Sequence, residues 1–398
     1  MALGPESQLS SVAHWLLCDG WRIPETEILV ESVVERLLLA GIPLQRLGVF
    51  LLVLHPEVLG VSYIWQGAGS PVVHQQIPRG FEHTDDFRLS PLTGIFAGTS
   101  AEVHQRIDAI AEDHPYPIYR TMRRQGISDY LCLPLEFSDS RHAISFSTVD
   151  PRGFSSEQVR EMRDTVLVLQ RILEAHNMRR IADVLLSTYV GTQAGPRILH
   201  GQITRGSSES IRAVIWLSDL RGFTPLSDQL PRDQLIERLN TYFDCVVPPI
   251  QRSGGEVLKF MGDAVLGMWR IDAGDDADVT ERALGAATEI SGRIALVNAQ
   301  ASGEGQPHLR FGAALHVGEV MYGNIGAYNR LDFTVIGPAV NLASRIEKLS
   351  KRVGHSILAS ADFAARCGVP LASLGSHALD GIAEAQEVFR VEVSGPGV

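Results

Sequence analysis

A tight hairpin in the second half of the chain restricts its fold more than any other feature. The segment GGEVLKFMGDAVLGMW, residues 254–269, has the pattern of two short apolar strands that meet at Met261-Gly262-Asp263. Around it, apolar periodicity predicts strands at 213–217, 309–317, 319–322 and 332–336, helices at 232–247 and 279–299, and a helix that begins at Pro338. Strands and helices alternate, while the hairpin makes part of the sheet antiparallel. We therefore expect an α+β sandwich of the ferredoxin-like type.

The first half of the chain has a different pattern. A helix is expected at 27–40, followed by Gly41, and strands are expected at 47–54, 61–65, 130–137 and 143–149. A long helix follows from Ser155 to about Ser187, and residues 188–210 resemble a connector rich in Gly, Ser and Thr. The spacing of Met162, Val166, Leu169 and Leu173 fits a short parallel coiled-coil dimer and a helix that packs on its own domain equally well.

Length and composition limit the class of protein. A chain of 398 residues is too long for one ordinary core, so two domains are expected. Acidic residues outnumber basic ones, 46 to 35, and no basic block occurs, which argues against a nucleic-acid partner. The four cysteines lie more than a hundred residues apart, and the longest apolar run, 47–54, is too short to span a bilayer. We expect a cytoplasmic protein without a transmembrane segment.

Two carboxylates are placed where a cation site could form. Asp219 follows the expected strand at 213–217, and Asp263 stands at the hairpin turn. Either residue alone is more often an ordinary turn or cap residue. On neighbouring strands, however, two carboxylates are what a two-metal phosphoryl-transfer site requires. The segment Gly222-Phe223-Thr224, just after Asp219, could turn its backbone N–H groups towards a phosphate.

A second pair of polar residues opens the helix after Pro338. Asn341 and Arg345 are four residues apart in TVIGPAVNLASR, so both side chains leave the same face of the helix. They could be a solvated surface pair. The guanidinium of Arg345 is also well suited to a phosphate in transition, because it is always charged and donates through a planar fork.

Four segments together resemble a known family. AVIWLSDLRGFTPLS, GGEVLKFMGDAVLGMW, GAALHVGEVMYGNIG and DFTVIGPAVNLASRIEKL are similar, in order and spacing, to the catalytic domain of class III adenylate/guanylate cyclases over about residues 208–393. This resemblance implies a ferredoxin-like domain that works as a head-to-tail homodimer with two interfacial active sites. It also implies two Mg²⁺ or Mn²⁺ ions in each site.

The resemblance also implies roles for individual residues. Asp219 and Asp263, with the Leu220 carbonyl, match the metal ligands; Lys259 and Thr334 match the pair that recognises the purine. Asn341 matches the residue that orients the ribose, and Arg345 the one that stabilises the transition state. In such a dimer, Lys259 and Asp263 would serve opposite active sites although they are four residues apart, and would not primarily form a salt bridge.

The purine-recognising pair favours ATP. A lysine donates to adenine N1, and a threonine hydroxyl accepts from the exocyclic amino group. Guanylate cyclases that resemble this chain typically have an acidic residue where Lys259 stands. We therefore expect an adenylate cyclase that converts ATP to 3′,5′-cyclic AMP and pyrophosphate. The alternatives are a guanylate cyclase and a catalytically weak homologue that binds nucleotide or dimerises. Asp380 favours the latter, because many family members have a basic residue in that segment.

The N-terminal half resembles a GAF-like α/β sensor domain more loosely, through DYLCLPLEF, HAISFSTVDPRGFSSEQ and the helix that follows. A PAS-like module is the alternative, and the sensor's ligand is unknown. His74, His83, His142 and Cys132 could ligate haem or a metal, although core or surface roles are favoured. The expected organisation is a sensor domain at 1–172, a helical dimerisation or transducer linker at 173–207, and the cyclase domain at 208–398.

Overall fold

The structure, a computed structural model, describes residues 10–111, 114–303 and 307–392. The chain divides into two compact units, Met1–Leu185 and Leu186–Val398, and each is described by itself. In the part of the chain that is described, no helix combines the length and the apolar character needed to cross a membrane.

The first unit is built on one antiparallel sheet with the strand order β3-β2-β1-β6-β5-β4. Its strands are β1 (Arg46–Leu52), β2 (Val58–Trp65), β3 (Val73–Pro78), β4 (Val103–Arg106), β5 (Asp129–Glu136) and β6 (Arg141–Thr148). Its helices are α1 (Ser11–Cys18), η1 (Gly20–Arg22), α2 (Thr26–Leu39), η2 (Phe81–His83), α3 (Asp85–Arg88), α4 (Pro91–Phe96) and α5 (Pro117–Arg124), and α6 (Ser156–Tyr189) begins in this unit.

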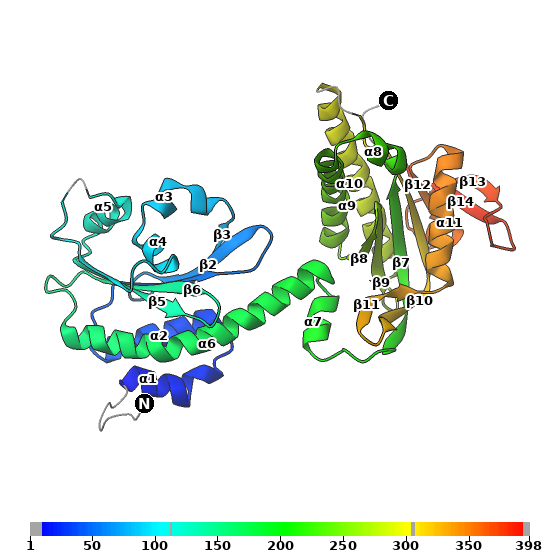
Figure 1. Ribbon diagram of the computed structural model, residues 1–398. Coiled ribbons are helices and arrows are strands. Elements are labelled where there is room, and N and C mark those ends of the chain that lie inside the picture. Colours follow the sequence, from blue (N-terminus) through cyan, green and yellow to red (C-terminus); the bar gives the residue numbers. More distant parts are fainter. Residues whose placement is uncertain (1–9, 112–113, 304–306, 393–398) are drawn as a thin grey trace. The chain divides into compact units, whose positions relative to one another are not determined.

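The two faces of this sheet are covered by different helices (Figure 1). On β1, Leu47, Val49 and Leu51 belong to the core formed with α1, α2 and α6. Phe50 points to the opposite face and packs near Ile95 of α4. Period-two alternation along β1 therefore separates the unit into two apolar layers, one on each side of the sheet.

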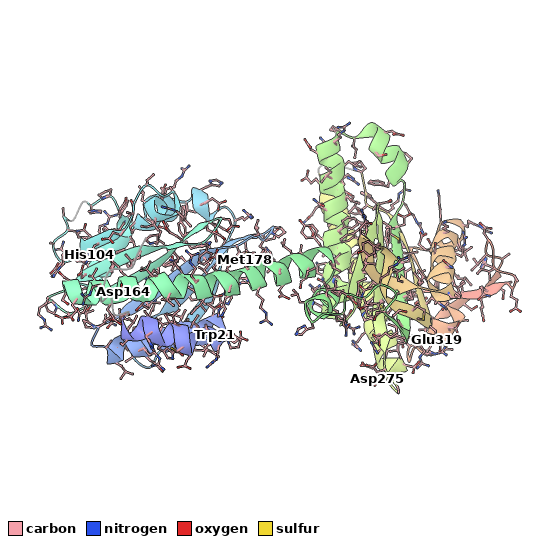
Figure 2. All side chains as sticks on the ribbon, turned by 60° about the horizontal axis from the view of Figure 1, so that its bottom comes forward. Trp21, His104, Asp164, Met178, Asp275 and Glu319 are labelled. Atoms are coloured by element: carbon pink, nitrogen blue, oxygen red, sulfur yellow. The ribbon has the colours of Figure 1, made fainter. Side chains whose placement is uncertain are left out.

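The predicted heptad pattern on the long helix packs inside its own unit. Met162, Val166, Leu169 and Leu173 are all buried, and they belong to the core that also contains residues of α2 and β1. Figure 2 labels Asp164 and Met178 on the same helix, and Met178 is exposed. The pattern is thus explained by intradomain packing, and it does not leave a free seam for a coiled-coil dimer.

Two edge strands, β3 and β4, had no clear signal in the sequence. β3 is exposed along most of its length, so it lacks the apolar alternation of a half-buried strand. On β4, His104 Nε2 lies 3.1 Å from Asp129 Oδ2 of β5, and His104 is labelled in Figure 2. Backbone pairing and polar contacts hold these edges in place, and Val103 of β4 adds a partly buried apolar contact.

The second unit contains an eight-stranded sheet with the order β13-β14-β12-β10-β7-β9-β8, and β11 pairs with β10. Its strands are β7 (Ser208–Leu220), β8 (Glu256–Met261), β9 (Ala264–Ile271), β10 (Phe311–Ala327), β11 (Arg330–Ile336), β12 (Ile357–Ser360), β13 (Ala372–His377) and β14 (Gln386–Arg390). Its helices are α7 (Ala194–Leu199), α8 (Phe223–Gln229), α9 (Arg232–Arg252), α10 (Asp276–Gly303), α11 (Pro338–Val353) and α12 (Ala361–Ala364).

Helices cover both faces of this sheet (Figure 1). Val214 and Trp216 of β7 belong to a core with α9 and α10. Ala213 and Ile215 point to the other face, where they share a core with residues of α7, β11 and α11. The β10 strand lies beside β7 and is antiparallel to it, whereas β12 runs parallel to β10. These layers agree with the predicted α+β sandwich.

One predicted break in a strand is absent. We expected two strands, at 309–317 and 319–322, but a single strand, β10, runs through Gly318. Gly318 pairs in register with Ala213 of β7. A Cβ atom at Gly318 would lie 2.5 Å from the Cβ of Ala339, so the glycine permits close packing of α11 instead of marking a turn. The predicted connector also contains α7, which the sequence had not indicated.

Candidate active site

The hairpin turn brings two carboxylates together. Asp219 lies at the end of β7. The residue before it, Ser218, pairs with Val265 of β9. The hairpin closes with the pair Met261 and Ala264, so that only Gly262 and Asp263 form the turn. Gly262 has φ +69°, a left-handed conformation that suits glycine. This turn places Asp263 beside the end of β7, where its carboxyl group interacts with that of Asp219.

The electrostatic environment of Asp219 is unfavourable for a second negative charge. Burial, the neighbouring Asp263 carboxyl group and the charge of Glu347 raise the pKa of Asp219 to about 7, although the Leu220 amide opposes this shift. Asp219 Oδ1 is buried and has no hydrogen-bond partner among the described residues. A pair of crowded carboxylates with an unsatisfied oxygen is a site that a cation would stabilise.

The residues present fit hard divalent cations. Mg²⁺ prefers carboxylate and carbonyl oxygens, and it commonly keeps positions open for substrate phosphates. Within the described ranges, no group of three or more His, Cys, Asp or Glu side chains could hold an ion by itself. Asp219 and Asp263, with the Leu220 carbonyl, would therefore supply only part of the coordination shell, and a phosphate ligand would complete it.

Two further charged residues near this pair escaped the sequence analysis. Glu347 of α11 is partly buried; burial raises its pKa, and Arg221 acts to lower it. Arg221 donates to Ser350 Oγ at 3.1 Å and to the His355 carbonyl at 2.8 Å. Gly312, opposite Asp219 on β10, leaves room for Glu347, because a Cβ there would lie 2.7 Å from Glu347 Oε1. Nothing in the sequence marked these two residues as different from ordinary helix and loop charges.

The predicted phosphate segment leads into a short helix. Gly222 has φ +76° and is exposed, and α8 begins at the next residue, Phe223. Thr224 lies within α8, but its side chain falls outside the part of the structure that is described. The amide groups at the start of α8 thus follow directly after Asp219 and Leu220 in the chain.

Lys259 is paired with a residue that we did not predict. Its Nζ lies 3.0 Å from Asp332 Oδ2 on β11, and no bond with Asp263 occurs among the described residues. Asp332 and Thr334 are two positions apart, so they leave the same face of β11. Thr334 is buried, and its Oγ1 has no hydrogen-bond partner in the described part of the chain. Lys259 is therefore held against the strand that carries Thr334.

A cavity of about 370 Å³ adjoins Lys259. It is lined by Lys259, Asp332, residues of β8 and β11, and the segment 187–191. Neither Asp219 nor Asp263 is among its described lining residues. Within one chain, the carboxylate pair and the Lys259 region are thus two separate groups.

Asn341 and Arg345 lie on the first half of α11. Asn341 is exposed, and Arg345 is partly buried. Ala343 and Ile346 are fully buried on the side of the helix that faces the sheet. Among the described residues, the side chains of Asn341 and Arg345 form no hydrogen bond or ion pair with the protein, so both remain available to a ligand. Asp380 is exposed in the turn after β13.

In the first unit, the histidines and the cysteine that were considered as metal ligands are buried in the core, stacked on a neighbouring ring or exposed on the surface. Burial lowers the pKa of His142 to about 4, and its Nδ1 accepts from the Leu52 amide at 2.9 Å. Burial also raises the pKa of the Cys132 thiol to about 12. His74 stacks on Tyr63, with ring centroids 5.1 Å apart, and His83 is exposed on η2.

Comparison with known proteins gives this geometry a family context. Residues 207–365 match the family described as the adenylate and guanylate cyclase catalytic domain. Adenylate cyclase 1 of Rhizobium meliloti (strain 1021) is 30% identical over 44% of this chain and 26% of its own length. The adenylate cyclase of Anabaena cylindrica is 35% identical over 38% of this chain and 30% of its own length. This chain therefore spans less than a third of the length of either relative.

A solved structure is also similar to this chain. The adenylyl cyclase CyaB from P. aeruginosa is 26% identical, with a TM-score of 0.41, over 46% of this chain and 95% of that one. From the family match, residues 207–365 are a class III nucleotidyl cyclase catalytic domain. The family includes enzymes for both purines, so the match alone does not fix the substrate.

Proposed function

We propose that the protein is an adenylate cyclase that converts ATP to 3′,5′-cyclic AMP and pyrophosphate. The interacting carboxyl groups of Asp219 and Asp263, together with the unsatisfied buried oxygen of Asp219, support this proposal most directly. It lies within the segment that matches the cyclase family. Two Mg²⁺ or Mn²⁺ ions, when bound there, would activate the ribose 3′-hydroxyl and neutralise the leaving pyrophosphate.

The other residues position the nucleotide for in-line attack on the α-phosphorus. Arg345 has no protein partner within the described ranges, so its guanidinium is available for the charge that develops on the phosphoryl oxygens. Asn341, one helical turn earlier, would hold the ribose. The amide groups from Gly222 to Thr224 would contact the phosphates near the carboxylate pair.

The purine would be bound by Lys259 and Thr334. Lys259 can donate to adenine N1, and the unsatisfied Oγ1 of Thr334 can accept from the amino group. The named relatives that are adenylate cyclases agree with this choice. One observation favours GTP instead: the Asp332 carboxylate beside Lys259 could accept from guanine N1–H.

We also propose that two chains share each active site. The carboxylate pair and the Lys259 region are separate groups in one chain, so a head-to-tail homodimer would bring the carboxylates of one subunit to the purine-binding residues of the other. Two such sites would form, one on each side of the two-fold axis.

The first unit would act as a sensor that regulates this site, and the connector provides a physical link to β8. Tyr322 donates to Glu256 Oε2 at 2.7 Å, and Ala194, at the start of α7, is buried in the same core as Leu258 of β8. Glu256 begins β8, three residues before Lys259. A displacement of α7 would therefore reach the strand that carries the purine-binding lysine.

The substrate is tested by assaying the purified full chain with ATP and with GTP, each with Mg²⁺ and with Mn²⁺. We expect cyclic AMP from ATP and little product from GTP. Lys259→Ala should lower kcat/KM for ATP by about ten- to a hundredfold, the value of a charge-assisted hydrogen bond. In the matched variant Asp332→Asn, activity with ATP should be retained. Faster turnover of GTP, lost in Asp332→Asn, would instead identify a guanylate cyclase.

A further inference from the structure

A cavity of about 550 Å³ lies within the first unit, on the sheet face opposite α2 and α6. Its floor is formed by residues of β1, β2 and β3, and its walls by the segment from η2 to α4 and by α5. This volume falls in the range that proteins use for small organic ligands. The proposed cyclase chemistry makes no use of this cavity.

The walls of the cavity are mainly apolar and aromatic. Phe81, Phe87 and Phe96 line it. The ring of Phe87 contacts the other two, with a centroid distance of 6.0 Å to Phe81 and of 6.0 Å to Phe96. Phe50 and Met122 also line it. Such a surface favours the apolar body of a ligand over a hydrated, multiply charged one.

One cation, Arg46, lies among the described residues of this apolar lining. It is the first residue of β1, a strand flanked by β2 and β6 in the middle of the sheet. Its side chain has no hydrogen bond or ion pair within the described part of the protein. Burial lowers the pKa of the Arg46 guanidinium, but the group stays charged because its ordinary pKa is so high. Arg46 is partly buried, and a partly buried guanidinium without a partner is costly unless a ligand supplies the missing anion.

The surrounding polar groups do not neutralise Arg46. Tyr130 lies nearby, and burial raises the pKa of its hydroxyl well above the usual value, so it is neutral near pH 7. Asp86, the one carboxylate among the described lining residues, is exposed and forms no ion pair with Arg46. Ser62, whose side chain is buried, adds a hydroxyl to the cavity wall. The cavity therefore offers a place for one negative charge in a mostly apolar space.

We propose that this cavity binds a small hydrophobic carboxylic acid, whose carboxylate pairs with Arg46 while its apolar body lies against Phe81, Phe87 and Phe96. A monoanion matches the single cation. A phosphate dianion would bring a second charge for which the described lining supplies no cation. Binding at this site does not depend on the cyclase reaction, so it can be measured even if the proposed activity is wrong.

Isothermal titration calorimetry of the full chain with octanoate, 1-octanol and octylamine tests the proposal. These probes share one apolar body and differ in their head group. We expect octanoate to bind about ten- to a hundredfold more tightly than 1-octanol, because its carboxylate forms a charge-assisted pair with Arg46. Octylamine should bind most weakly, because its ammonium group would face the guanidinium.

Substitutions distinguish the contribution of the Arg46 charge to binding from that of the apolar walls. Arg46→Gln should bind octanoate no more tightly than 1-octanol, and Arg46→Lys should keep part of the preference. Arg120→Gln removes an exposed arginine of α5 and should match the wild type. Phe87→Ala should weaken octanoate and 1-octanol to a similar extent. Equal affinity of the wild type for octanoate and 1-octanol, or no binding of either, would overturn the proposal.

Thermal unfolding gives a second test, which measures the stability of the protein with and without ligand. Octanoate should raise the Tm of the wild type by mass action, and it should raise that of Arg46→Met by no more than 1-octanol does. Without ligand, Arg46→Met should unfold at a higher temperature than the wild type, because an unpaired and partly buried charge has been removed. A lower Tm in Arg46→Met would show that Arg46 has a structural role and would contradict the proposed site.

Discussion

Both units of the protein contain partly buried charges without an opposite charge, but the two cases differ in sign and in chemistry. In the second unit, Asp219 and Asp263 crowd two carboxyl groups together and raise the pKa of Asp219 to about 7. In the first unit, Arg46 faces a cavity alone. A carboxyl pair can relieve its repulsion by taking up a proton, whereas a guanidinium cannot lose its charge near neutral pH.

The position of each charge in its fold suggests what it binds. Asp219 and Asp263 lie at a strand end and in a two-residue turn, where phosphates can approach together with cations. Arg46 lies on an inner strand beneath short helices and aromatic side chains. We therefore expect the carboxylates to serve turnover and the arginine to serve retention of a regulatory ligand. The following predictions test this contrast.

Loss of one carboxylate should have the largest effect. Asp219→Ala should lower kcat by at least roughly 10³-fold, because the cations would lose a ligand and the transition state its electrostatic support. Cyclic AMP production by the purified variant measures this loss. The matched variant Asp244→Ala, at an exposed position of α9, should remain active. Wild-type turnover in Asp219→Ala would remove the proposed metal site.

Removal of the unpaired arginine on α11 should have the next largest effect. Arg345→Ala should lower kcat on the order of 10²–10³-fold with a much smaller change in KM, since its contact strengthens as charge develops in the transition state. Steady-state kinetics with ATP measures both constants, and Arg352→Ala on the same helix is the control. Unchanged kcat with a raised KM would assign Arg345 to binding of the ground state.

Mixing two inactive variants tests whether two chains share each site. Asp219→Ala and Arg345→Ala should each be inactive as homodimers. In a mixed dimer, one site would contain both substitutions and the other neither. With random pairing, half of the dimers are mixed and half of their sites are intact, so about a quarter of wild-type activity should return. A cyclic AMP assay of the mixture measures this quarter, and isolated doubly tagged dimers, all of which are mixed, should have about half of wild-type activity. Stable but inactive mixed dimers would exclude the shared site.

The smallest expected effect concerns stability without divalent cations. The native pKa of Asp219 is about 7 and its unfolded value is about 3.9. Between about pH 4 and 7 the native state holds a proton that the unfolded state lacks, so stability falls as pH rises through this window. Asp263→Asn should reduce that fall, because it removes the neighbouring negative charge.

Differential scanning calorimetry of the full chain in a chelator measures this effect. At pH 8, Asp263→Asn should unfold about 2–4 °C above the wild type if roughly 1 kcal/mol is relieved, and solvent screening at this partly exposed site will reduce the gain. At pH 4 the difference should disappear, and Asp244→Asn should show none at either pH. A Tm difference that is independent of pH would point to packing instead of charge.

Much of the fold followed from local patterns. The helix at 27–40 and the strand at 130–137 were predicted within one or two residues of α2 and β5, because α2 is buried with a helical period and β5 is a short, almost continuously buried run. The exposed strand β3 was missed because most of its side chains face water and leave no apolar pattern. Gly318 was misinterpreted as a break, since the sequence cannot show that a helix packs closely against that glycine.

The candidate site was predictable only in part. Asp219, Asp263 and Arg345 stood out because their motifs occur in a recognisable order. The pairing of Lys259 with Asp332 was not foreseen, because the two residues are 73 positions apart in the sequence. They lie on β8 and β11, which come near each other only when the chain folds. Glu347 was missed for the same reason: its proximity to Asp219 depends on the packing of α11 near Gly312.

The sequence by itself determined the hairpin, the helix that starts at Pro338 and the order of the cyclase motifs, because turns, caps and motif spacing depend on neighbouring residues. Only the tertiary structure decided which charges would have partners. Three features depend on long-range packing: the burial of the pattern from Met162 to Leu173 in its own unit, the interaction between Asp219 and Asp263, and the isolation of Arg46 in an aromatic cavity. Such packing sets the local dielectric and the available partners of each charge. These two factors decide whether a charged residue is neutralised within the protein or remains available to a ligand.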